Sequence, residues 1–366
     1  MRKTIRYHYY HYYTSFFLRR GISGRDGPYI YSERKTAFRR KGSDRMKKFV
    51  VKWLCVMLGT FLIPFCFKSA VPPRQNGSGV AATPTEVPVP SGDTVRVYFP
   101  EEDRTEEMDL REYIVGVTAA EMPVSFAHDA LCAQALASLT YTLYQRAHPK
   151  AALADGAAVS TDPAAYQAYW TEDEMRERWG GDYEENLAKI RRAVDEVIGY
   201  EIVYGDEPVA AAFHAVSPGR TESAENVWGA EIPYLVSVES AGDSVSPKYA
   251  SSLTVNAKEL KAKLGLEAEG APEDWFGEPV YSEAGTLLSV EIAGREFTGQ
   301  ELRGVFGLRS AAIAIDCDGD AVTFSVRGYG HGVGLSQYGA DYYARQGMTW
   351  REIIGHYYPG TSIVER

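Results

Sequence analysis

The sequence predicts an α+β fold for residues 94–366, and three observations support this prediction. Apolar residues alternate with period two in some segments and recur with helical spacing in others. These segments are interleaved without the regular strand–helix–strand order that builds a parallel sheet. No internal repeat is visible along the 366 residues. The pattern is typical of strands and helices that share one globular body.

The first elements of this region are a strand at 94–99 and a helix that closes soon after Glu121, at Pro123. A second helix is expected over 127–147, where apolar residues follow one face, and Ser125 is its expected N-cap.

The remaining elements follow from turn and capping signals. In order, we expect short helices and loop at 162–179, a charged helix at 182–198 ended by Gly199, a hairpin of 200–204 and 208–215 around 205–207, a short strand at 234–238, strands mixed with short helices 256–264 and 299–306 across 246–327, and a final helix opened by a Thr349–Glu352 capping box.

Charge is very unevenly distributed along the chain, whose net charge is −10. Segment 1–48 is strongly basic, whereas the body after it is strongly acidic. Phosphate backbones repel an acidic body, so nucleic-acid binding is not expected. The basic segment has another explanation, because it immediately precedes an apolar run.

That apolar run, 49–67, has Lys52 as its single charge and approaches the roughly 20 residues that span a bilayer. We expect a transmembrane signal-anchor with a cytoplasmic N-terminus and an extracytoplasmic body, 94–366, tethered by a flexible Pro/Gly/Ser-rich linker, 68–93. A cleaved signal peptide is the alternative. Residues 1–45 lack a structural period, and Met46 is the expected true start.

Cysteine usage excludes a disulfide framework, because Cys55 and Cys66 fall inside the apolar run. Cys132 and Cys317 are expected to be free, buried thiols, with a single bridge between them as the alternative.

Glu121 is the first residue that indicates chemistry. It lies between Ala119-Ala120 and Met122-Pro123 in an otherwise apolar context. Burial there would disfavour the charged carboxylate and raise its pKa, as a general acid near neutral pH requires. The alternative is a glutamate that caps the helix end or forms an exposed salt bridge.

Two further stretches are polar and aromatic. In 213–237 a Ser-Pro-Gly-Arg-Thr-Glu-Ser loop precedes Trp228 and Tyr234, and aromatic faces beside polar donors suit sugar rings, although an ordinary turn is equally consistent. In 327–347 alternating glycines surround His331 without the spacing of a phosphate-binding or dinucleotide loop. A tight turn that presents His331, Ser336 and Gln337 to a cleft is the better interpretation.

No metal site or cofactor is expected. The sequence has neither Cys-x-x-Cys nor His-Glu-x-x-His, and His214, His331 and Cys132 are dispersed along it. A Cys132–His nucleophile pair is disfavoured by the position of Cys132 on a predicted helix face.

Together these stretches resemble the stage II sporulation protein D family over about 94–363. The segment from Gly328 to Ala340, Gly-Tyr-Gly-His-Gly-Val-Gly-Leu-Ser-Gln-Tyr-Gly-Ala, and the His-Tyr-Tyr-Pro-Gly-Thr of 356–361 are the most specific matches. Residues 119–123 match the segment that holds the family's catalytic glutamate, and 219–222 with 233–235 match its middle motif.

The resemblance implies a peptidoglycan lytic transglycosylase of spore engulfment, with Glu121 as the catalytic acid/base. Implied partners are peptide-stripped glycan strands and a membrane-bound amidase/endopeptidase. The substrate contacts we expect are Tyr141, Ser217, Arg220, Thr221, His331, Ser336 and Gln337.

The chain departs from the family at two positions of the helix after Glu121. Cys132 stands where the family usually has Lys, and Leu139 where it usually has Arg. The middle loop has Pro218 where Gly is usual, and it lacks the Cys with which some relatives hold zinc. Because related domains include amidase enhancers, a non-catalytic glycan-binding enhancer is the alternative function, and a water-using hydrolase is a third.

Overall fold

The computed structural model describes residues 92–149 and 153–366, which fall within one unit, Glu86–Arg366. The expected signal-anchor 49–67, the start at Met46 and nearly all of the linker 68–93 lie outside the described residues. Within the described residues, no helix is long and apolar enough to cross a membrane.

Helices and strands alternate irregularly, so the predicted mixture of both in one body is confirmed. The helices are α2 (Leu110–Glu121), α3 (His128–Ala147), α4 (Glu172–Trp179), α5 (Tyr183–Val197), α6 (Ala224–Trp228), α7 (Ala257–Leu264), α8 (Gly299–Phe306), α9 (Gln337–Arg345) and α10 (Trp350–Tyr357). The strands are β1 (Thr94–Phe99), β2 (Arg104–Asp109), β3 (Val159–Ser160), β4 (Tyr200–Tyr204), β5 (Glu207–Pro208), β6 (Phe213–His214), β7 (Ala250–Asn256), β8 (Val280–Tyr281), β9 (Leu287–Ile292), β10 (Arg295–Phe297), β11 (Ala312–Asp318), β12 (Ala321–Arg327), β13 (Leu335–Ser336) and β14 (Ser362–Glu365).

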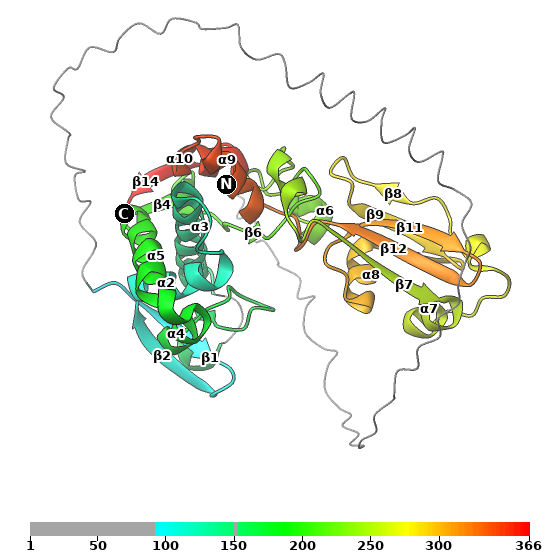
Figure 1. The fold of residues 1–366 in the computed structure, drawn as a ribbon, viewed down its shortest axis with the longest axis horizontal. Coiled ribbons are helices and arrows are strands. Elements are labelled where there is room, and N and C mark those ends of the chain that lie inside the picture. The colour runs from blue at the N-terminus through cyan, green and yellow to red at the C-terminus, as the bar shows by residue number, and fades with distance from the viewer. Residues whose placement is uncertain (1–91, 150–152) are drawn as a thin grey trace, which may run out of the picture. The chain divides into compact units, whose positions relative to one another are not determined.

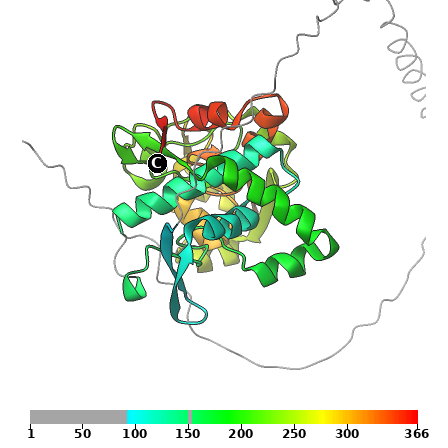
Figure 2. The same ribbon diagram turned by 90° about the vertical axis from the view of Figure 1, so that its left-hand side faces the viewer.

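Helix α3 is the centre of the larger hydrophobic core. It packs against α2, α5, α9 and α10, as Figures 1 and 2 show from two sides. Every residue from Ala130 to Thr140 is buried, which fits a helix that neighbours cover on all sides. The small sheets β2-β1-β3 and β14-β4-β5 complete this core.

A second hydrophobic core belongs to the segment from Val255 to Val326. Here β7, β12 and β11 form an antiparallel sheet beside α7 and α8 (Figure 1). The pairing register is set by alternating apolar side chains, and Thr254 and Thr323 hydrogen-bond across the strands at 2.9 Å.

Several predicted elements are confirmed with little change. Strand β1 has the expected bounds, and α7 and α8 lie within one residue of the two helices predicted inside 246–327. The capping box of Thr349 and Glu352 forms at the start of α10, with both reciprocal hydrogen bonds present.

The predicted cap of α3 is wrong. Its N-cap is Ala127, which has no capping side chain. The Ala127 N–H instead donates to Asp341 Oδ1 of α9 at 2.7 Å, so a distant carboxylate satisfies a group that Ser125 was expected to serve.

Two strand predictions also need correction. The stretch 208–215 divides into the end of β5 and the separate β6, which pairs in parallel with β13. The stretch 234–238 is irregular, because Leu235 and Val238 give their carbonyls to the N–H groups of Ala224 and Thr221 instead of to a neighbouring strand. Apolar alternation there reflects burial of Leu235 against the core.

Candidate active site

Glu121 is the last residue of α2, and local sequence places it there. Asp109 caps the helix by accepting the N–H of Glu112, and the following Met122-Pro123 ends it, because a residue before proline avoids helical backbone angles. Met122 is accordingly extended. Glu121 therefore projects from a helix C-terminus, where the aligned peptide dipoles disfavour a negative charge.

Two donors hold the carboxylate of Glu121. The Ala168 N–H donates to Oε1 at 2.6 Å, and the Gln337 side-chain amide at the start of α9 forms a second hydrogen bond. Gln337 Nε2 also donates to Gln134 Oε1 at 3.2 Å, and Gln134 Nε2 donates to Ser138 Oγ at 3.0 Å. A chain of amides thus links the carboxylate to α3.

Burial raises the pKa of Glu121, so that the carboxyl group can carry a proton near neutral pH. It raises the pKa to about 7, against the opposing effects of the Ala168 and Gln337 hydrogen bonds. The side chain is largely enclosed but keeps some exposed surface, so a ligand can reach it. At neutral pH the group populates both protonation states, as an acid that must also serve as a base requires.

Tyr141 lies on the side of α3 that faces Glu121. Burial raises the pKa of its phenol, and the nearby charges of Tyr166 and Glu121 add to this effect. Tyr113, one helix away, is fully buried, and Glu121 is among the groups that raise its pKa as well. Tyr141 therefore lies near Glu121, while its contact with a substrate stays a prediction.

Cys132 and Leu139 do not lie beside Glu121, contrary to the expectation that their basic counterparts would. They are seven residues apart and share one face of α3, whereas Gln134, Ser138 and Tyr141 share roughly the opposite face. Leu139 is buried in the larger core, and Cys132 contacts His128. Both residues thus lie on the side of α3 opposite Gln134, the residue that accepts a hydrogen bond from Gln337.

A second polar cluster fixes the loop that supplies Gln337. Asp243 accepts the hydroxyl of Ser336 at 2.5 Å and the hydroxyl of Ser217, and burial raises its pKa. Ser336 also caps α9 by accepting the Gly339 N–H. Both serines are fully buried, so the observed role of their hydroxyls is to anchor the start of α9.

His331 belongs to an aromatic cluster near this loop. Its ring lies 5.7 Å from that of His214 and 5.3 Å from that of Trp228, which is exposed. Burial lowers the pKa of His331 to about 3 and that of His214 to about 4, so both are neutral at physiological pH. Although His214 and His331 are dispersed along the sequence, the fold brings their rings together.

Arg220 and Thr221 occupy the middle loop in different ways. Arg220 is partly exposed and lies 3.4 Å from Glu283. Thr221 is fully buried, and its hydroxyl accepts the Val238 N–H at 2.9 Å. Arg220 can reach a ligand, whereas Thr221 supports the irregular 234–238 segment.

Two residues of the candidate site could not be singled out from the sequence, or were overlooked there. Asp243 is in a short 3₁₀ turn with no motif around it, and its role depends on serines 26 and 93 residues away. Gln134 carried a usable signal, since it is a polar residue among Ala and Leu, four residues before Ser138 and seven before Tyr141 on one helical face.

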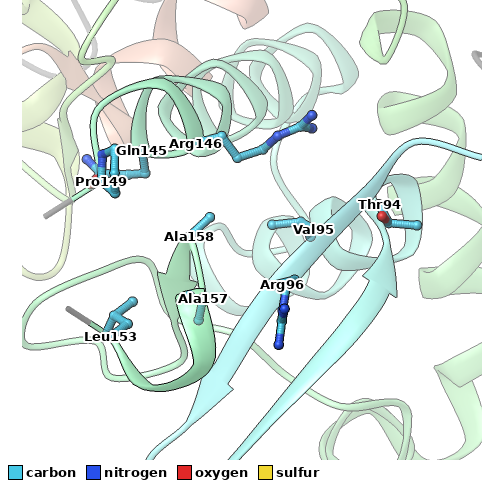
Figure 3. Close-up of a pocket in the computed structure, with 10 residues that line it drawn as sticks. Thr94, Val95, Arg96, Gln145, Arg146, Pro149, Leu153, Ala157 and Ala158 are labelled. Carbon is cyan, nitrogen blue, oxygen red and sulfur yellow. The ribbon is translucent and has the colours of Figure 1, made fainter.

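A separate pocket lies where β1 passes the C-terminal end of α3 (Figure 3). Its volume is about 380 Å³ and its lining includes Arg96, Gln145 and Arg146. None of the residues predicted to act on a substrate lines it, so we do not assign it to the active site.

Replacement of Gln337 by Leu should shift the pH dependence of Glu121. The Gln337 hydrogen bond lowers the pKa of that carboxyl, so its loss should raise the pKa above about 7. The protonated form would then persist to higher pH, moving the alkaline limb of any Glu121-dependent activity upward by up to about one pH unit. Carboxyl ¹³C titration measures this shift directly. Gln346→Leu, at the exposed end of α9, is the matched control, and equal titration curves for both variants would contradict the assignment.

Comparison with known proteins places this geometry in context. The family model described as "Stage II sporulation protein" matches residues 100–204. The chain is 36% identical to "Stage II sporulation protein D" of Bacillus amyloliquefaciens over 87% of this chain and 95% of that protein. It is 36% identical to the protein of that name from Bacillus subtilis (strain 168), over 81% and 84% of the two chains. An "Amidase enhancer" of the latter organism is 26% identical over 68% of this chain and 40% of its own length.

Proposed function

Because the chain belongs to the stage II sporulation protein D family, we propose that it is a lytic transglycosylase that cleaves peptidoglycan glycan strands. The observation that carries the proposal is a single glutamate, Glu121, enclosed enough for a pKa of about 7 and held by Ala168 and Gln337. Hydrolytic glycosidases typically use two carboxylates at a defined separation, and a lytic transglycosylase needs one.

The proposed reaction uses both protonation states of Glu121. The carboxylic acid protonates the glycosidic oxygen between N-acetylmuramic acid and N-acetylglucosamine as that C–O bond breaks. The resulting carboxylate takes the proton of the muramic acid 6-hydroxyl, whose oxygen bonds to the anomeric carbon. The product is a 1,6-anhydro sugar, no water is consumed, and Glu121 regains its proton. An internal nucleophile benefits from enforced proximity.

Residues around Glu121 could position the glycan strand for this reaction. Tyr141 and Gln337 are close enough to Glu121 to position a sugar at it. Arg220, Trp228 and His331 offer a cation and aromatic faces for the rest of the strand. We further propose that the body acts outside the cell membrane, tethered through 49–67, during wall remodelling in spore engulfment, beside an amidase/endopeptidase that strips peptides from the strands.

The products of the reaction test the proposal. Purified glycan strands, with and without peptides, are incubated with the full chain and analysed by mass spectrometry. We expect anhydro-ended fragments from the peptide-free strands. Reducing ends would instead indicate a hydrolase that uses water, and intact strands would contradict catalysis altogether.

A second candidate function is that of a non-catalytic enhancer. It is favoured by the similarity to a protein named amidase enhancer. In that case the strands would bind to the chain and stay intact, and cleavage would appear only when a partner wall hydrolase is added.

A further inference from the structure

Behind the active site, three potential metal ligands meet between α3 and α5. They are His128, Cys132 and Glu196, whose donor atoms all lie within 4.8 Å of one another. His128 Nε2 lies 3.5 Å from Cys132 Sγ and 2.8 Å from Glu196 Oε2. Nothing in the proposed reaction uses these residues, since they face away from Glu121.

We propose that His128, Cys132 and Glu196 form a zinc-binding site that joins α3 to α5. Tetrahedral zinc bonds of about 2.3 Å to sulfur and about 2.0 Å to nitrogen place these two atoms about 3.5 Å apart. The observed separation of the sulfur and nitrogen atoms is the same, 3.5 Å. The nitrogen–oxygen pair has to open by roughly 0.6 Å to admit the ion, a shift that side-chain rotation supplies.

The surrounding structure already orients the three side chains as metal ligands. His128 and Cys132 are four residues apart on one helix, so both point in the same direction. Glu196 Oε1 accepts the indole N–H of Trp350 at 2.8 Å, which fixes the carboxylate and leaves Oε2 directed at the other two ligands. An outer partner of this kind orients ligands in zinc sites generally.

The charges of the three ligands and their access to solvent favour Zn²⁺ as the bound ion. One thiolate, one carboxylate and one neutral imidazole balance the charge of Zn²⁺, which suits a half-buried position. The sulfur and nitrogen donors select zinc over magnesium or calcium, which prefer oxygen. Cys132 is buried, whereas His128 and Glu196 are partly exposed, so the ion can enter from solvent and a water can be its fourth ligand.

The contacts of Cys132 fit a nucleophilic role less well than they fit zinc binding. Burial, together with the charges of Glu196 and Asp129, raises the pKa of the thiol, against the smaller opposing effect of Arg192. The same His128 nitrogen also contacts both the thiol and the carboxylate, so the imidazole cannot relay a proton between them. A bound zinc would displace the thiol proton to solvent and form the Zn–S bond.

Cobalt substitution tests the site in the chelator-stripped full chain. We expect stoichiometric Co²⁺ to produce a near-ultraviolet thiolate-to-cobalt absorption, which Cys132→Ser abolishes. His128→Gln and Glu196→Gln should weaken Co²⁺ and Zn²⁺ affinity at least tenfold. Zinc should also raise the melting temperature of the wild type but not that of Cys132→Ser.

Matched controls use residues of the same types elsewhere. Cys317→Ser and His148→Gln, the latter at the opposite end of α3, should bind cobalt like the wild type. Equal melting temperatures of wild type and Cys132→Ser without metal would show that the serine variant is folded. The proposal is overturned if the absorption persists in Cys132→Ser, if the wild type binds no cobalt, or if zinc shifts the melting of both proteins equally.

Discussion

Glu121→Gln is expected to reduce glycan cleavage by roughly 10⁴-fold, because one group serves as both acid and base and each such role contributes about 10²–10⁴-fold. Glutamine keeps an oxygen that can accept the Ala168 N–H, so the fold should persist. The rate of release of anhydro-ended fragments from peptide-free strands measures the effect. Glu112→Gln, an exposed glutamate on the same helix, is the matched control and should cleave normally.

Unfolding by urea separates loss of activity from loss of structure. The pKa of Glu121 is raised in the folded protein, so the folded state binds its proton more tightly than the unfolded state does. The stability from this group is present below the unfolded value of about 4.5 and is lost as pH rises through about 7. Glutamine does not titrate, so the variant should equal or exceed the wild type in stability at pH 8. Substantial cleavage by the folded Glu121→Gln variant would contradict the assignment of Glu121 as the catalytic acid/base.

Gly334→Ala is expected to lower the free energy of unfolding by about 3 kcal/mol or more. Gly334 has a φ of +72°, and a Cβ there would lie 2.0 Å from the carbonyl oxygen of Ala212. That oxygen accepts the Leu335 N–H at 3.0 Å in the pairing of β6 with β13. The added methyl group would force these segments apart and displace Ser336 and Gln337, so cleavage should also fall. Urea unfolding measures the first effect.

Gly347→Ala distinguishes collision from backbone strain. Gly347 also has a positive φ, +96°, but apart from its two chain neighbours no residue has an atom within 4 Å of the place that a Cβ would occupy there. Its substitution should cost only the backbone strain, about 1–2 kcal/mol. Equal losses in the two variants would mean that the close approach to Ala212 is unimportant.

Local signals predicted most of the helices correctly, because capping and apolar spacing are properties of neighbouring residues. Thr349 and Glu352 satisfy each other's backbone donors within one turn, so the sequence alone locates α10. The 234–238 segment failed for the opposite reason. Its carbonyls pair with Thr221 and Ala224 through a loop, and apolar alternation cannot distinguish such pairing from a strand.

The candidate active site also contains one part that local sequence predicts and another part that only tertiary packing determines. Glu121 was predictable, since its apolar neighbours and the proline after it are adjacent in sequence. The partners that set its acidity were harder to find, because Ala168 lies 47 residues from it and Gln337 bonds to Gln134 across 203 residues. Cys132 is the free, buried thiol that the sequence predicted, but its contact partner Glu196 could not be predicted, because it belongs to another helix, α5. Pairings of this kind follow from tertiary packing, which local periodicity does not encode.

The dependence of Glu121 on Gln337 also has a consequence for biosynthesis. Ribosomes add Glu121 more than two hundred residues before the amide that bonds to it, and before Asp243 and Ser336 can anchor that amide. A nascent or C-terminally truncated chain therefore contains the acid without its assembled surroundings. Such a chain contains Glu121 without the complete surroundings that bury it and raise its pKa, so the proposed activity is expected only of the completed chain.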